Sequence, residues 1–151
     1  MDGLNDRHDD PADDHAEQQA VAFGAPGEWV QLAAVDRASG ALCGDCAVRV
    51  EERMAELGVT FAPEHQGRGL AREALTAVIG RLFGEHGLHR VFAETDDRNA
   101  GVHRLFERLG FRCEARLVEA DWFKGEWSTL RLYAILNREW RRHENALQRG
   151  D

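Results

Sequence analysis

The chain has 151 residues, 43% of them hydrophobic, which suits one domain with one hydrophobic core. No apolar run approaches the length of a membrane span and no charged-then-apolar leader is present, so we expect a cytoplasmic protein without a membrane partner. The three cysteines are too few and too odd in number for a disulfide framework.

The net charge of −8 is concentrated near the N-terminus. Residues 1–20 hold seven of the 27 acidic residues but only one of the 19 Lys and Arg residues, so the rest of the chain is close to neutral. This argues against a basic nucleic-acid surface, and we expect no nucleic-acid partner. An acidic stretch poor in apolar residues cannot bury enough surface to order itself. We therefore expect a disordered tail at 1–15, a single domain at 16–140 and a polar C-terminal tail at 141–151.

Turn residues and apolar runs predict the elements of the first half. Residues 16–23 suit a short helix, closed by the Pro26-Gly27 turn that follows. Residues 29–35 and 41–50 read as two strands of a hairpin across a polar turn. A third strand, 55–61, comes after a charged turn, and its short connection implies antiparallel pairing with the second.

Apolar residues at three- and four-residue steps from Leu70 to Phe83 predict an amphipathic helix, which the glycines of 84–87 end. Residues 91–95 then read as a strand. Because strand, helix and strand follow one another here, this strand is expected to lie parallel to the third.

Asn99 is placed to open a second helix, and Gly110 to end it as a C-terminal cap. Residues 112–119 and 128–136 predict a closing strand pair joined across 121–127. The expected fold class is therefore α+β, with a mixed, mostly antiparallel central sheet flanked by helices.

The most informative segment is 61–71, Phe-Ala-Pro-Glu-His-Gln-Gly-Arg-Gly-Leu-Ala, between the third strand and the first long helix. A loop of this kind directs several backbone N–H groups toward the positive end of a helix dipole, where phosphate binds. Gly67 and Gly69 have no side chain, so a pyrophosphate can approach the main chain. No Gly-Lys-Ser/Thr follows and position 72 is Arg, which excludes a nucleotide P-loop and a dinucleotide fingerprint. A plain tight turn is the alternative.

Two motifs together indicate a family. The loop from Gln66 to Ala71 resembles the Gln/Arg-x-x-Gly-x-Gly/Ala acyl-CoA loop of the GNAT acetyltransferases. The helix that begins at Asn99 and ends in Leu-Gly-Phe at 109–111 resembles the next motif of that family, and a strand lies between the two as in the family. The similarity runs from about Trp29 to Trp140.

The end of the chain resembles one branch of that family. Trp127 and residues 133–140 are similar to the RimJ/RimL branch, which acetylates protein N-termini, small amines and antibiotics. The resemblance implies a GNAT-like acyl-CoA N-acyltransferase fold and transfer of the acetyl group from acetyl-CoA to a primary amine by direct attack. The implied partner is a small-molecule or peptide amine acceptor.

The resemblance also implies where acetyl-CoA binds. The backbone N–H groups of 66–71 would hold its pyrophosphate, and its pantetheine arm would fill a gap where the third strand splays from its parallel neighbour. A backbone N–H near Phe61 would stabilise the developing oxyanion. The cofactor-binding residues implied in this way are Val59, Phe61, Gln66, Gly67, Arg68, Gly69, Leu70, Ala71, Asn99, Arg104 and Phe106.

The amine must lose a proton before it attacks, so a carboxylate within reach is required. The branch resemblance points to Glu51 at the end of the second strand, and Glu56 on the third strand is the other main candidate. Glu94 and Asp96, at the end of the parallel strand, are further candidates. Each is otherwise a solvated surface charge.

The chain departs from the family in three places. Phe106 stands where many members have a tyrosine, and Val102 stands where the branch often has a serine, and neither side chain donates a proton. Family members also begin with a further strand and helix, so we expect a late start of translation or a partner chain that covers the gap. The uncovered edge strand at 29–35 predicts a homodimer. An acyl-CoA-binding module without efficient catalysis is the alternative function.

Five other side chains invite a functional interpretation. Cys43 and Cys46 have metal-knuckle spacing, but no second pair exists and positions three apart in a strand face opposite sides, so we expect no metal. His65 is expected to be an exposed loop residue. Trp122 and Trp127, in the predicted last turn, either line the acceptor entrance or pack at the end of the sheet.

Overall fold

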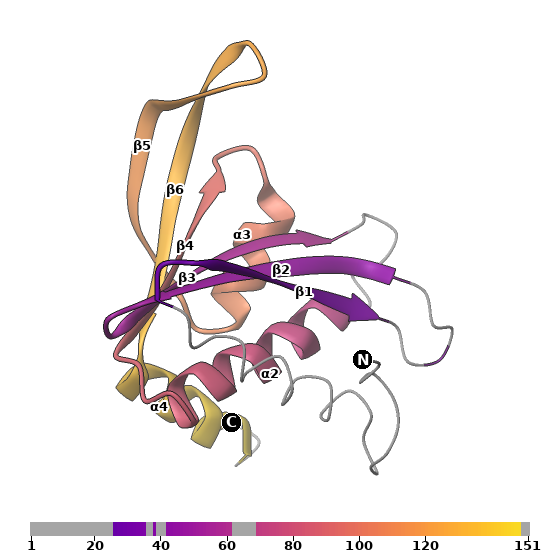
Figure 1. Cartoon of the computed structure of the whole chain (residues 1–151), viewed down its shortest axis with the longest axis vertical. Helices are drawn as coiled ribbons and strands as arrows, with labels where there is room; N and C mark the ends of the chain where they lie inside the picture. The colour runs from indigo at the N-terminus through magenta and orange to yellow at the C-terminus, as the bar shows by residue number, and fades with distance from the viewer. Residues whose placement is uncertain (1–25, 36–37, 39–41, 62–68, 149–151) are drawn as a thin grey trace.

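A computed structural model of the chain describes residues 26–35, 38, 42–61 and 69–148. Six strands form one sheet in the spatial order β1-β2-β3-β4-β6-β5 (Figure 1). They are β1 (Trp29–Val35), β2 (Leu42–Glu51), β3 (Met54–Phe61), β4 (Arg90–Asp96), β5 (Arg112–Phe123) and β6 (Glu126–Leu136). The helices in these residues are α2 (Leu70–Gly84), α3 (Ala100–Arg108) and α4 (Asn137–Gln148). The predicted tail at 1–15 and helix at 16–23 lie outside this range.

The sheet has the mixed character that the sequence predicts. Neighbouring strands are antiparallel throughout, except that β3 and β4 run parallel because α2 crosses over between them. The α+β fold class is confirmed, and the first four strands agree with their predicted bounds to within about one residue. None of the helices in the described range combines the length and the apolar character needed to cross a membrane.

The hydrophobic core lies on the helix-covered face of the sheet. Alternate residues of the central strands point into it, because successive side chains of a strand face opposite sides. Figure 1 shows α2 running along the β1–β3 part of the sheet and α3 close to β4. The buried apolar side chains include Val48, Ala55, Leu57, Leu75, Ile79, Leu82, Val91, Phe106, Tyr133, Ile135 and Trp140.

Helix α4 continues past residue 140, where we expected the polar C-terminal tail to begin. Trp140 is its one large buried anchor, and it packs against Phe83 of α2 with ring centroids 6.3 Å apart. At the start of the helix, the Asn137 side chain donates to the Leu88 carbonyl at 2.7 Å and thereby ties α4 to the end of α2. Apart from Trp140, Ala146 and Leu147, the residues of α4 are polar, so the sequence does not show a continuous apolar stripe that would predict a helix.

The β5–β6 hairpin is longer than predicted. Its two-residue turn is Lys124-Gly125, both with positive φ, as in the tight turns that favour antiparallel hairpins. Trp122 and Trp127 are therefore strand residues that face each other across the hairpin, with rings 5.2 Å apart. The prediction that 121–127 forms the connection is wrong, because the two tryptophans extend the pairing up to the turn.

A candidate active site between two parting strands

The central parallel strands separate halfway along their length. β3 pairs with β4 only from Met54 opposite Arg90 to Leu57 opposite Ala93. Beyond this point β3 continues beside β2, and β4 continues beside β6, in a different direction (Figure 1). The main-chain edge of 58–61 that faces β4 thus has no partner strand in the described part of the chain. Backbone groups need hydrogen-bond partners, so this edge suits an extended ligand that adds to the sheet.

A cleft of about 140 Å³ opens between the parted strands, with α3 on one side. Its apolar lining comes from β3, β4 and α3, and its polar groups come from the end of β4 and the start of α3. The lining residues are Leu57, Val59, Ala93, Glu94, Thr95, Asp96, Asn99, Val102 and Phe106.

Three residues that the motifs single out lie in this lining. Val59 is half-buried on β3, at the point where the strand has left β4. Asn99 is the N-cap of α3, and its side chain accepts a hydrogen bond from the Val102 N–H at 3.2 Å. Phe106 is buried and stacks on Tyr133, with ring centroids 5.8 Å apart. Phe61 ends β3, and Arg104 is exposed on α3 outside the cleft lining.

The start of α2 has the features of an anion-binding position. Gly69 is its N-cap, with φ 79° and no side-chain cap, and a Cβ at Gly69 would meet no atom of the described residues within 4 Å. The N–H groups of the first turn have no acceptor inside the helix, because the first intrahelical bond runs from Glu73 N–H to the Gly69 carbonyl at 3.0 Å. Leu70 and Ala71 belong to this turn, so the helix end fits a diphosphate. Gln66, Gly67 and Arg68 lie outside the described residues.

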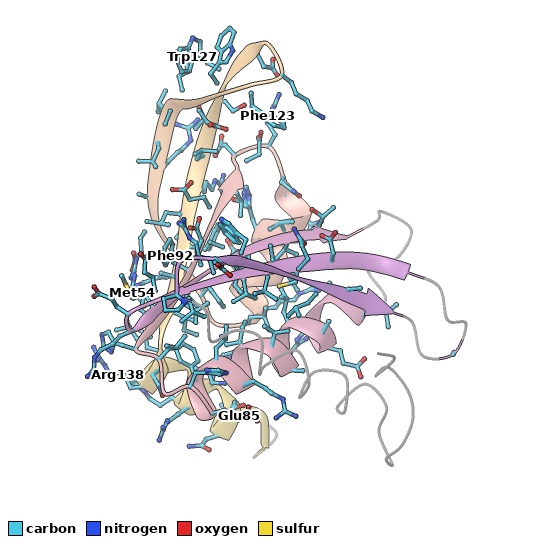
Figure 2. The ribbon with its side chains drawn as sticks, viewed as in Figure 1. Met54, Glu85, Phe92, Phe123, Trp127 and Arg138 are labelled. Atoms are coloured by element: carbon cyan, nitrogen blue, oxygen red, sulfur yellow. The ribbon has the colours of Figure 1, made fainter. Side chains whose placement is uncertain are left out.

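The two carboxylates that the sequence favours as bases lie outside the cleft lining. Glu51 is opposite Met54 at the start of β3, about 10 Å along the strand from Leu57, because β2 runs antiparallel to β3. In Figure 2, Met54 marks this end of β3. Glu56 directly precedes Leu57, but its side chain is held by Arg49 at 2.7 Å.

Two carboxylates at the end of β4 line the cleft, and their surroundings differ. Asp96 is held by Arg98, with 2.9 Å between Oδ2 and Nη2, and hydrogen bonds from Arg98 lower the pKa of Asp96 to about 2. The side chain of Glu94 is exposed and forms no hydrogen bond or ion pair with any described residue. Glu94 is therefore better placed to accept a proton than Asp96. The sequence gives Glu94 no priority over Glu51 and Glu56, because which carboxylates border the gap between the strands depends on the tertiary structure.

One histidine beside the cleft carries no motif signal in the sequence. His103 is a buried residue of α3, and its Nε2 lies 3.0 Å from Thr95 Oγ1 and 3.0 Å from the Asp96 carbonyl oxygen. Its ring stacks on Tyr133 at 5.5 Å. Burial lowers the pKa of His103 below its usual value, so the ring is neutral at pH 7.

The two tryptophans and Cys46, which the sequence also singles out, do not line the cleft. Trp122 and Trp127 are exposed at the tip of the β5–β6 hairpin, and Figure 2 shows Trp127 and Phe123 at this tip. Cys46 is buried in the core, and burial raises the pKa of its thiol to about 12. His65 lies outside the described residues.

Several curated proteins are similar to this chain. It is 34% identical over 89 residues to the uncharacterized N-acetyltransferase YnaD of Bacillus subtilis, covering 59% of this chain and 52% of that protein. It is 32% identical over 84 residues to a spermidine N(1)-acetyltransferase of Vibrio cholerae, covering 56% and 49%. It is 31% identical over 104 residues to the putative ribosomal N-acetyltransferase YdaF of Bacillus subtilis, covering 67% and 57%. The chain thus spans about half the length of these relatives.

Solved structures share the fold. A GCN5-related N-acetyltransferase from Brucella melitensis matches with a TM-score of 0.72 and 27% identity, over 79% of this chain and 56% of that one. A GNAT-family acetyltransferase from Bacillus anthracis matches with a TM-score of 0.67 and 27% identity, over 72% and 67%. The profile of the family described as "Acetyltransferase (GNAT) domain" matches residues 5–112, which is more than half of the chain. On this match, and with the parted central strands that the fold contains, the chain belongs to the GNAT acetyltransferase family.

Proposed function

We propose that this chain is an acetyl-CoA-dependent N-acetyltransferase, which transfers an acetyl group to a primary amine by direct attack while both substrates are bound. The observation that carries the proposal is the cleft between β3 and β4, in a fold whose third strand leads along the chain to a helix start without a side-chain cap. An extended acyl carrier that ends in a diphosphate has the shape and charge for these two features. When bound, acetyl-CoA supplies the activated acyl group as a thioester.

The chain's main-chain groups hold the carrier in this proposal. The N–H groups of 66–71 bind the diphosphate, and the dipole of α2 contributes about 0.3–1 kcal/mol at an exposed helix end. The free edge of β3, through Val59 and Phe61, pairs with the extended arm. A backbone N–H near Phe61 stabilises the negative charge that develops on the carbonyl oxygen.

A carboxylate takes the proton from the attacking amine. We assign this role to Glu94, because the residue lines the cleft and its carboxylate is exposed and unpaired among the described residues. Glu56 is the second candidate, although it would have to leave Arg49. Glu51 is the third, because it lies about 10 Å along the strand from the start of the cleft.

The acceptor class follows from the branch resemblance and from charge. We propose a RimJ/RimL-like enzyme whose acceptor is a protein N-terminus, a small amine or an aminoglycoside-like molecule. The relatives named above include a spermidine acetyltransferase and a putative ribosomal acetyltransferase. The neutral-to-acidic charge of the chain beyond residue 20 and the unpaired Glu94 at the cleft favour a cationic amine.

A second function is an acyl-CoA-binding module without efficient catalysis. Val102 and Phe106 favour it, because they line the cleft at the two positions where the family resemblance expects proton donors. The edge position of β1, which pairs only with β2 among the described strands, also supports a homodimer in either case.

Calorimetry with coenzyme A, followed by an assay of thiol release from acetyl-CoA, separates these functions. We expect heat of binding, and turnover with at least one member of a panel of polyamines, peptides with free N-termini and aminoglycosides. Binding without turnover on any acceptor would favour the module. The absence of any binding heat would reject both functions.

A further inference from the structure

Among the described residues that line the cleft, Thr95 alone has a hydroxyl. Five lining residues are apolar: Leu57, Val59, Ala93, Val102 and Phe106. A polar group beside such a wall is costly to desolvate unless it has a hydrogen-bond partner. Thr95 is half-buried, and strand alternation places it on the same face of β4 as Val91 and Ala93, which are both buried.

The partner of this hydroxyl is the buried imidazole of His103. The Nε2 atom lies 3.0 Å from Thr95 Oγ1 and equally 3.0 Å from the Asp96 carbonyl oxygen. A carbonyl oxygen only accepts, so the proton of the neutral ring must be on Nε2. The ring therefore donates at this position, and Thr95 Oγ1 accepts. The hydroxyl hydrogen of Thr95 remains available to donate to a group in the cleft.

We propose that Thr95 donates a hydrogen bond to the thioester sulfur of the acyl carrier, and that His103 is the positioning residue that orients this hydroxyl. The inference rests on the proposed function, because it requires a thioester in the cleft. A thiolate that forms beside an apolar wall needs a donor, and hydrogen bonds to charged atoms are stronger than those to neutral ones. Val102 and Phe106 supply none.

The step balances without a proton from Thr95. The amine nitrogen bonds to the acyl carbon, the carbon–sulfur bond breaks, and its electron pair stays on sulfur. The amine proton passes to Glu94, and solvent later protonates the sulfur. Thr95 keeps its proton and stabilises the sulfur charge by the hydrogen bond alone, while the N–H of His103 holds the hydroxyl oxygen in place.

The thiol pKa of bound coenzyme A tests the hydrogen bond from Thr95 to sulfur, and the measurement needs no amine acceptor. It is measured from the ultraviolet absorbance of the thiolate as pH is raised, with the protein saturated. We expect Thr95→Val to raise this thiol pKa by about 1–2 units, because the variant loses a hydrogen bond to the charged sulfur. Thr95→Ser keeps the hydroxyl and should stay close to the wild type. Thr76→Val makes the same change on α2, where the Thr76 hydroxyl bonds only the Arg72 carbonyl, and should have no effect.

The role of His103 has its own pair of variants. His103→Phe keeps a ring against Tyr133 but loses the N–H, and we expect a smaller rise in the bound thiol pKa than in Thr95→Val. His103→Gln keeps an N–H donor at similar reach and should restore most of the wild-type value. Equal thiol pKa values in His103→Phe and the wild type would overturn the positioning role.

The results separate this inference from the proposed function. If Thr95→Val binds coenzyme A with wild-type affinity and leaves the bound thiol pKa unchanged, the hydrogen bond to sulfur is wrong while the proposed function stands. If the wild-type protein does not bind coenzyme A, both are wrong. If Thr95→Val misfolds, His103→Phe compared with His103→Gln decides the question, because loss of the N–H that orients the hydroxyl should still raise the bound thiol pKa.

Discussion

Glu94 differs from the neighbouring carboxylates because no described residue pairs with it. Asp96 and Glu56 are held by Arg98 and Arg49. If Glu94 accepts the amine proton, Glu94→Gln should lower kcat at saturating amine by at least about 100-fold, the smaller end of the range for general base catalysis. The dissociation constant for coenzyme A should change little, because the amide keeps the shape of the carboxylate. Steady-state kinetics and calorimetry measure the two quantities.

Glu51→Gln is the matched control for this experiment. It makes the same chemical change about 10 Å along the strand from the start of the cleft, so we expect wild-type kcat. A loss of kcat in Glu51→Gln with none in Glu94→Gln would assign the base to Glu51 and refute the assignment made from the cleft. Glu56→Gln completes the set, and a loss there alone would assign the base to Glu56.

The sequence motifs identify some residues of the site and miss others. The motifs lead to Val59, Asn99 and Phe106, and all three line the cleft. They do not lead to His103, whose partners Thr95 and Asp96 belong to another element. Neighbourhoods of this kind depend on the packing of α3 against β4, which no local pattern encodes.

At the scale of elements, α3 is bounded by the two residues that the sequence predicts. Asn99 caps its start, and Gly110 follows its end with φ 93°. A Cβ at Gly110 would sit in this left-handed conformation and 3.2 Å from His143 Nδ1. We therefore expect Gly110→Ala to lower the free energy of unfolding by about 1–2 kcal/mol, measured by urea denaturation.

Gly84→Ala is the control for that substitution. Gly84 is the last residue of α2, and a Cβ there would meet no atom within 4 Å. Alanine loses less conformational entropy than glycine on folding, so this variant should be unchanged or more stable by up to about 1 kcal/mol. Equal losses in both variants would show that the conformation at Gly110 has no special cost.

The connection between β4 and α3 is held by charge. Asp97 accepts from Arg131 of β6 at 2.7 Å and from Arg116 of β5 at 3.2 Å, and these bonds lower the pKa of Asp97. A carboxylate with a lowered folded-state pKa stabilises the fold above its unfolded value of about 3.9, and this contribution is lost as pH falls through the folded-state pKa.

Asp97→Asn tests whether the contribution of Asp97 to stability is lost as pH falls. The variant should have a lower urea midpoint than the wild type at pH 7, and the difference should shrink as pH falls below about 4, because the wild-type carboxyl becomes neutral as well. Urea titrations at pH 7 and at the lowest pH where both proteins fold supply the comparison. A difference that grew as pH fell would contradict the direction of the pKa shift.

The helices and strands that the sequence predicts correctly are those with strong local sequence patterns. Strands with alternating burial and the amphipathic α2 were predictable, because each has a clear period and clear turn residues at its ends. The tip of the β5–β6 hairpin and the continuation of α4 were not. Pairing of Trp122 with Trp127 and burial of Trp140 against Phe83 stabilise these parts, and both contacts join separate elements.

For the whole molecule, the prediction of a homodimer rests on β1. It lies at the edge of the sheet and pairs only with β2 among the described strands. Two copies joined through this edge should give twice the chain mass of 17.0 kDa in light scattering. Ala33→Lys, an exposed change on β1, should give the mass of one chain, because a lysine on the edge strand blocks pairing.

Ala77→Lys adds the same charge on the exposed side of α2 and should leave the dimer intact. A wild-type mass equal to one chain would refute the dimer. A dimer that survives Ala33→Lys would move the interface away from β1.

The sequence by itself determined the mixed sheet, the crossover helix α2 and the two family motifs, because hydrophobic period, turn residues and loop glycines act over a few residues at a time. The tertiary structure alone decided where β3 and β4 separate, and with it which side chains line the cleft. Beyond the point of separation, β3 stays paired with β2, whereas β4 stays paired with β6. Which partner each strand keeps depends on contacts between separate elements, and no local sequence pattern shows it.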